Sequence, residues 1–263
     1  MAVSNTELRD TIAIIIALAF GFAYKFTGPA TLSNWSGNFI LTLILVAISV
    51  LIHDFVHKLV ARKFLADVKS KIWLSGIIVM LILLVISKGW LVFAAIWAVS
   101  IIPLRLLRPN RTWPHLGPKE RSIIAVSGSL SNLALAVFAK VLVPVFGSIA
   151  TKLMTINLTI ALFNLVPFFT LLPIIALQRR SEKPLETPYV EGEFVFFGSR
   201  TLWVFLFVFT IALAVSLLYL SALVSVLLAL FLAFLLFVAW HYFFESEYLP
   251  EMKMSGPSYR HYK

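Results

Sequence analysis

Two histidines four residues apart, His53 and His57, stand with Asp54 in a stretch of sequence that is otherwise apolar. On a helix this spacing places both imidazoles on one face, about 6 Å apart along the axis. Neutral imidazole is a common zinc ligand, and two such rings can share one ion. Asp54 is placed to take a proton from a water that the metal activates. The pattern indicates either a metal site or the polar end of a membrane helix that reaches the headgroups beside Lys58.

The elements that must position these residues are membrane helices. The chain has 263 residues, of which 60% are hydrophobic and 13% charged, whereas a soluble domain is roughly half apolar and a quarter charged. The stretch 201–244 holds 44 residues without one Asp, Glu, Lys or Arg. About 20 apolar residues cross a bilayer, so this stretch predicts two helices with a turn near Leu220. The absence of cysteine excludes disulfides, thiolate metal sites and cysteine nucleophiles.

We expect an all-α fold, a polytopic membrane helix bundle of about six transmembrane helices plus a short hydrophobic hairpin that either spans or re-enters the membrane. The expected spans are 11–26, 39–60, 122–146, 149–177, 201–219 and 222–244, and the hairpin comprises 72–87 and 90–104. No internal repeat divides the sequence. A single membrane domain is therefore expected over 1–263, with a cytoplasmic insertion loop at 178–198.

The net charge of +10 does not indicate nucleic-acid binding, because the basic residues fall in short clusters between the apolar spans. With the N-terminus in the cytoplasm and the hairpin returning to the same face, 18 of the 22 Lys and Arg residues lie inside. This asymmetry is the usual orienting signal of membrane proteins. We expect an integral protein of the cell membrane, surrounded by lipid, with both termini in the cytoplasm.

Three segments together resemble one known family. The stretch 53–64, which continues to Trp73 and Gly76, is similar to the site-2 protease family of intramembrane zinc metalloproteases, in particular its archaeal-type members. Those proteins have His-Glu-x-x-His, then a basic connection and a short apolar hairpin. Residues 127–136 resemble the family's Ala-Gly-Pro-x-x-Asn-x-x-Leu-Ala helix, and 157–167 resembles its Phe-Asn-Leu-Leu-Pro region. The resemblance implies zinc as the cofactor and transmembrane proteins or peptides as substrates.

The departures from the family pattern concern the acidic residues. The family's base is Glu, whereas this chain has Asp54, which is one methylene shorter. The family's third ligand is an Asp followed by Gly, but the family spacing counted from Asn164 reaches Leu172, which cannot bind metal. With an insertion, Glu191 and the glycine after it take that place. Glu191 is then either the third ligand, since zinc accepts carboxylate oxygen, or a solvated loop carboxylate.

The function that the resemblance implies is hydrolysis of peptide bonds in or near transmembrane segments. His53, His57 and Glu191 would hold the zinc ion, and Asp54 would accept a proton and return it to the leaving amine. The matching Asn164 would contact the substrate or the developing oxyanion. The alternative is a catalytically inactive scaffold of the same fold that binds transmembrane helices, which the change from Glu to Asp at position 54 favours.

Other schemes fit the sequence less well. An intramembrane aspartyl protease requires two membrane aspartates, whereas Asp54 is the only one expected in a span. A rhomboid-type serine protease requires a buried His on a later helix, and none is expected after the weak nucleophile motif Ser127-Gly128-Ser129. A transporter would spread polar residues across the membrane, whereas here they gather at one end. Two further amides, Asn132 and Asn157, are expected to make helix–helix contacts.

Overall fold

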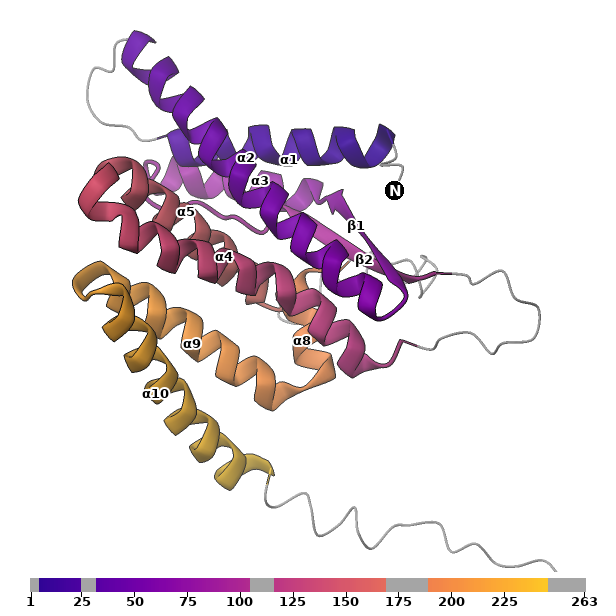
Figure 1. Cartoon of the computed structure of the whole chain (residues 1–263). Coiled ribbons are helices and arrows are strands. Elements are labelled where there is room, and N and C mark those ends of the chain that lie inside the picture. Colours follow the sequence, from indigo (N-terminus) through magenta and orange to yellow (C-terminus); the bar gives the residue numbers. More distant parts are fainter. Residues whose placement is uncertain (1–4, 25–31, 105–115, 169–188, 246–263) are drawn as a thin grey trace, which may run out of the picture.

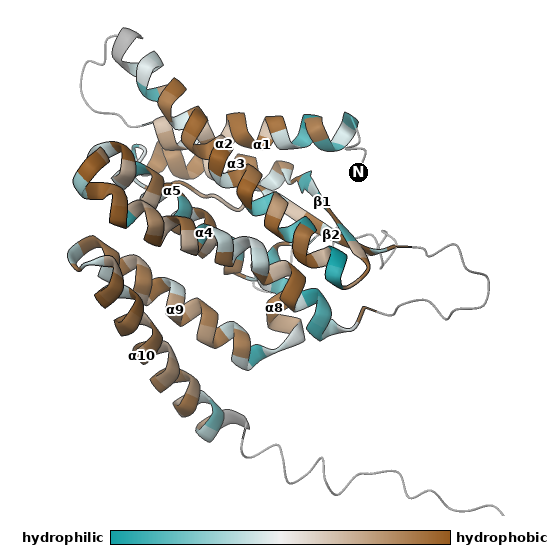
Figure 2. Cartoon of the chain, viewed as in Figure 1, coloured by the Kyte–Doolittle hydropathy of each residue, from teal (hydrophilic) through white to brown (hydrophobic). Residues whose placement is uncertain are grey.

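Long apolar helices dominate the structure, a computed structural model that describes residues 5–24, 32–104, 116–168 and 189–245 (Figure 1). Within these residues, five helices are long and apolar enough to cross a membrane. They are α2 (Leu32–Lys63), α4 (Pro118–Phe146), α5 (Ser148–Leu165), α9 (Arg200–Tyr219) and α10 (Ala222–Trp240). Figure 2 shows hydrophobic residues along most of their length. The expected all-α membrane bundle is confirmed.

Two of the other described helices lie in the first half of the chain. Helix α1 (Asn5–Ala23) covers most of the first expected span, but it begins earlier and carries three charged residues near its start, Glu7, Arg9 and Asp10. It is not among the five candidate spans. Helix α3 (Leu74–Ile86) matches the first half of the expected hairpin, and its 13 residues are short for a crossing.

The second half of the expected hairpin is not a helix. Its last residues form strand β2 (Trp97–Pro103), which pairs antiparallel with strand β1 (Ala66–Ile72). The first five residues of β2 are all buried, and its sequence is apolar apart from Ser100 and does not alternate. Such a run does not distinguish a buried strand from a short helix, which is why the sequence did not predict this sheet.

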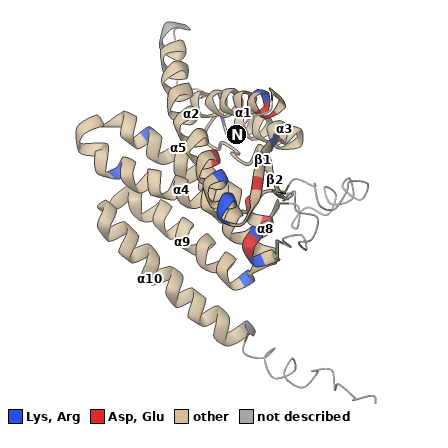
Figure 3. Ribbon diagram, turned by 45° about the vertical axis from the view of Figure 1, so that its right-hand side comes forward, with Lys and Arg blue, Asp and Glu red and all other residues tan. Residues whose placement is uncertain are grey.

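The helices pack in a fixed order across the molecule. Helix α10 packs on α9, α9 on α5, α5 on α4, α4 on α2, and α2 on α1 (Figure 1). The turn from α4 to α5 passes through Gly147 at a positive φ of 52°, a conformation that glycine adopts without strain. Charged residues gather around the C-terminal end of α2, β1 and α8 (Figure 3).

The short helix α8 (Glu191–Gly198) lies within the region expected to be an insertion loop. Residues 178–188 of that loop, like the end of the expected span 149–177, lie outside the described residues. Helix α8 contacts α4, α5 and α9. Its first three residues and Val195 are buried, so this part of the region is a packed element of the bundle.

Candidate metal centre

Three potential metal ligands converge between α2 and α8. His53 and His57 lie one turn apart on α2, and Glu191 is the first residue of α8. The Nε2 atoms of His53 and His57 lie 2.7 and 3.2 Å from Oε1 of Glu191. All three side chains are at most 1% exposed. The structure thus brings together the two histidines and the displaced carboxylate, and Glu191 is not a solvated loop residue.

The chemistry of these atoms fits a metal ion. No hydrogen bond of acceptable geometry satisfies Nε2 of His53, Nε2 of His57 or Oε1 of Glu191 within the described chain, although the three atoms are close together. Buried polar atoms without partners are rare and need an explanation. Two imidazole nitrogens and one carboxylate oxygen are a known ligand set for a catalytic zinc ion with a free fourth position.

Two backbone contacts place Glu191. Just before it, Tyr189 pairs with Val99 of β2 through N–H···O bonds of 2.8 and 3.0 Å. Just after it, Gly192 packs so closely on the C-terminal end of α5 that a Cβ would lie 2.3 Å from the Leu165 carbonyl oxygen. The glycine that follows the carboxylate is therefore required by packing, because any side chain there would push α8 away from α5.

The electrostatic surroundings of Glu191 favour its charged form. Helix α8 has eight residues and is not a membrane span. Burial raises the pKa of the Glu191 carboxyl, but attraction to the His53 and His57 imidazoles in their protonated form outweighs burial and holds this pKa well below its usual range. The side chain is thus held as a carboxylate, the form that binds metal.

Helix α4 contacts the Nδ1 atoms of both imidazoles, the ring nitrogens that do not face Glu191. Nδ1 of His57 lies 2.8 Å from the carbonyl oxygen of Ile124, which can only accept, so Nδ1 carries the proton. Nδ1 of His53 lies 3.0 Å from Nδ2 of Asn132, and Oδ1 of the same amide has no partner in the described chain. Turning this amide by 180° exchanges its nitrogen and its oxygen, and in that orientation the oxygen accepts from Nδ1–H of His53. With the amide in that orientation, and once each ring has lost its second proton, both rings present an unprotonated Nε2 toward Glu191, the tautomer that binds metal.

Two neighbouring residues of α4 complete this face. At Gly128 a Cβ would lie 2.3 Å from Nε2 of His57 and 2.6 Å from Nε2 of His53, so only glycine leaves room beside the two rings. Ser129 donates its hydroxyl to Oε2 of Glu191 at 2.6 Å. One face of α4 therefore contacts all three potential ligands.

The expected base follows His53 on α2, and the expected oxyanion contact lies on α5, next to Leu165, on which Gly192 packs. Asp54 is partly buried, and its Oδ1 accepts a hydrogen bond of 2.8 Å from the Ser70 hydroxyl on β1. Asn164 lies on α5, 1% exposed, and neither atom of its amide has a hydrogen-bond partner in the described chain. A buried amide in this state is available to a ligand.

The remaining two amides differ in role. Asn157 donates to the Ser49 hydroxyl of α2 at 2.9 Å, the helix–helix contact expected for it. Asn132 also joins two helices, but its partner is the potential ligand His53. The sequence analysis did not identify the parts played by Gly128 and Ser129. A glycine inside a helix was the available signal, because it costs about 1 kcal/mol relative to alanine and usually has a packing reason.

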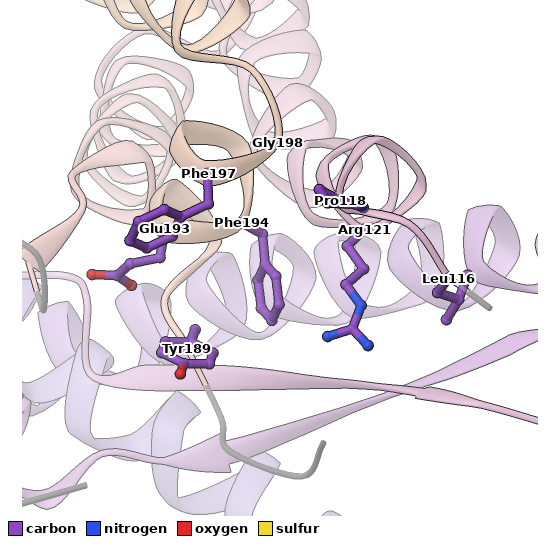
Figure 4. A pocket seen from close by; sticks show the side chains of 8 residues that line it. All are labelled: Leu116, Pro118, Arg121, Tyr189, Glu193, Phe194, Phe197 and Gly198. Carbon is purple, nitrogen blue, oxygen red and sulfur yellow. The ribbon is translucent and has the colours of Figure 1, made fainter. Parts of the chain in front are cut away.

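A hollow of about 310 Å³ borders α8 two residues beyond Glu191 (Figure 4). Its lining residues come from the start of α4, the chain before α8, and α8 itself: Leu116, Pro118, Arg121, Tyr189, Glu193, Phe194, Phe197 and Gly198. Figure 4 shows the Arg121 guanidinium between Phe194 and Leu116. The hollow thus combines aromatic rings with one cation beside the helix that carries Glu191.

Comparison with known proteins identifies the family. The chain is 32% identical over 171 residues to a Methanocaldococcus jannaschii protein named "putative zinc metalloprotease", and the alignment covers 62% of this chain and 79% of that protein. No family model matches the chain. No solved structure matches it either. On the strength of this relative, the chain belongs to the same family of zinc metalloproteases.

Proposed function

We propose that this protein is an intramembrane zinc endopeptidase of the site-2 protease kind, which hydrolyses peptide bonds in or near the transmembrane segments of membrane-protein substrates. The observation that carries the proposal is the convergence of His53, His57 and Glu191, buried inside a bundle of apolar helices. The name of the M. jannaschii relative supports zinc and proteolysis. The position of the three ligands on and beside a membrane helix supports cleavage within the membrane.

Each residue near the three ligands has a distinct part in the proposed reaction. A zinc ion in such a site supplies Lewis acidity, which polarises a peptide carbonyl and makes water more acidic. Asp54 accepts the proton of the attacking water and returns it to the leaving amine. The Ser70 hydroxyl holds one oxygen of Asp54, which leaves the other oxygen for the proton. The unpaired amide of Asn164 donates to the carbonyl oxygen as negative charge develops there.

The proposed setting is the cell membrane, with both termini in the cytoplasm. The charged residues gathered near α8 and the C-terminal end of α2 support this orientation, with that end of the bundle in the cytoplasm (Figure 3). His53 and His57 lie within the last eleven residues of α2, so the site is close to this polar end. We propose that water enters from the cytoplasm and that the substrate is a transmembrane helix that unwinds locally.

A reconstituted cleavage assay tests the proposal. The full chain is placed in lipid vesicles with a panel of labelled transmembrane peptides, and both the products and the bound zinc are measured. The Asp54→Asn variant removes the proton acceptor and keeps the size of the side chain. Cleavage is expected to fall by about 10²- to 10⁴-fold, the contribution of general acid–base catalysis, while bound zinc is unchanged.

The matched control is Asp67→Asn on strand β1. Asp67 accepts a hydrogen bond from the backbone N–H of Val68 and does not contact the three ligands. This variant is expected to cleave as the wild type does. If the wild type binds zinc and cuts no peptide of the panel, the protein is the inactive scaffold that the change to Asp54 favours. If Asp54→Asn cuts at the wild-type rate, Asp54 is not the base.

A further inference from the structure

The two oxygens of the Glu191 carboxylate have different surroundings. Oε1 faces Nε2 of His53 and Nε2 of His57, at 2.7 and 3.2 Å. Oε2 points to α4, where it accepts the hydroxyl proton of Ser129 at 2.6 Å. Because Glu191 and Ser129 are both at most 1% exposed, water does not compete for this bond. Only one of the two oxygens is therefore directed toward the imidazoles.

Ser129 differs from the other serines that α4 buries or partly buries. Ser122, Ser127 and Ser131 each donate to a carbonyl oxygen three or four residues back on the same helix, at 2.8, 2.6 and 2.7 Å. This local bond is the usual one for a serine inside a helix. Ser122 also lies 2.7 Å from the Phe194 carbonyl oxygen of α8, and Ser127 lies 3.3 Å from Nδ1 of His57. Of these four serines, Ser129 is the one that donates to a side-chain carboxylate, Oε2 of Glu191 on α8. Its hydroxyl is thus directed at the carboxylate and is not used by its own helix.

Without this hydrogen bond, the orientation of the Glu191 carboxylate would be poorly fixed. A glutamate has one more rotatable bond than an aspartate, so its carboxylate can reach the same place in more orientations. Glu191 is also the first residue of a helix of only eight residues, and at this end the backbone alone does not fix a side chain. A hydrogen bond to the second oxygen removes the rotation of the carboxylate. Residues that orient a ligand in this way commonly change metal affinity by 10- to 100-fold.

We propose that Ser129 is a positioning residue for Glu191, which it holds as a ligand through the single oxygen Oε1. The inference rests on the proposed zinc site. It gives Ser129, which is not itself a ligand, the role of fixing the orientation of the Glu191 carboxylate. With Ser129 in place, Oε2 is occupied and does not bind the metal. Without it, Oε2 is a buried oxygen with no donor, and the carboxylate either rotates away or turns both oxygens to the metal.

Metal binding by the full chain in detergent micelles tests this role without reference to activity. Zinc affinity is measured by competition with a coloured chelator for the wild type, Ser129→Ala and Ser129→Thr. The alanine variant is expected to bind zinc 10- to 100-fold more weakly. Threonine keeps the hydroxyl, so it is expected to bind at least fivefold more tightly than alanine does. Loading with Co²⁺ gives a second readout, because the visible spectrum of bound Co²⁺ responds to the number of oxygens that bind the ion. Of the two variants, only Ser129→Ala is expected to have a spectrum different from that of the wild type.

Ser131→Ala is the matched control, since it removes a partly buried hydroxyl two residues away that donates to the Gly128 carbonyl. It is expected to leave zinc affinity and the Co²⁺ spectrum as in the wild type. The inference is overturned if the wild type binds zinc and Ser129→Ala binds it within twofold with the same spectrum. It is overturned equally if Ser131→Ala loses as much affinity. A wild type that binds no zinc contradicts the proposed function first, and the role of Ser129 with it.

Discussion

The glycine beside the two imidazoles offers a sharp perturbation, the replacement Gly128→Ala. The added methyl carbon would lie 2.3 Å from Nε2 of His57 and 2.6 Å from Nε2 of His53, whereas ordinary contacts begin near 3.4 Å. It would therefore overlap both rings by about 1 Å or slightly less. Neither ring retreats easily, because His57 is hydrogen-bonded to Ile124 and His53 to Asn132. The methyl must move the two nitrogens away from the position in which they face Glu191.

The size of the effect follows from the cost of overpacking. Inserting one methylene-sized group into a packed interior costs about 1–3 kcal/mol. If the added methyl destabilises the metal-bound form by this amount and leaves the metal-free form unchanged, zinc affinity falls by roughly 5- to 140-fold, because 1.4 kcal/mol corresponds to a factor of ten. Competition with a coloured chelator measures the change directly. The far-ultraviolet circular dichroism of the variant is expected to match the wild type, because alanine favours helix.

Gly37→Ala on α2 is the matched control. A Cβ at Gly37 meets nothing within 4 Å, so the same substitution there leaves zinc affinity unchanged. If Gly128→Ala binds zinc as tightly as the wild type, the space between the imidazoles is not where the metal lies. The assignment of the site would then be wrong, whatever the activity of the variant.

Replacing Ser70 with alanine removes the hydroxyl that donates to Asp54, so cleavage is expected to fall about tenfold while zinc content stays constant. An unchanged cleavage rate would show that Asp54 acts without the hydrogen bond from Ser70. Asn164→Ala is expected to lower kcat on the order of 10²-fold, as for loss of an oxyanion donor, without changing zinc affinity; equal losses in both would mean a structural role. Asn157→Ala breaks the contact with Ser49 and is expected to lower the free energy of unfolding by about 0.6–1.7 kcal/mol, and a weaker zinc site instead would contradict that assignment.

The sequence predicted the membrane bundle well because its signal is strong. A helix that crosses a bilayer needs a long apolar run, and the runs at 39–60, 122–146, 201–219 and 222–244 all lie within helices or match them closely. The sheet was missed for the opposite reason. Strand β2 is short and buried, and a short apolar run does not reveal its secondary structure.

The site was predictable in part. The spacing of His53 and His57 required only helical geometry, whereas Glu191 was reached through the family resemblance. What no spacing could reveal was the role of α4. Ser129 and Asn132 lie 62 and 79 residues from their partners in the sequence, so only the packing of α4 against α2 and α8 brings them to the ligands.

Zinc K-edge X-ray absorption of the purified full chain tests the central claim most directly. Our account predicts one zinc ion per chain, coordinated only by nitrogen and oxygen at about 2.0–2.2 Å, with the scattering pattern of two imidazoles. Replacing either His53 or His57 with alanine is expected to remove the zinc or reduce the imidazole contribution to one ring. A wild-type protein without zinc, or zinc whose neighbours include no imidazole, would contradict the account.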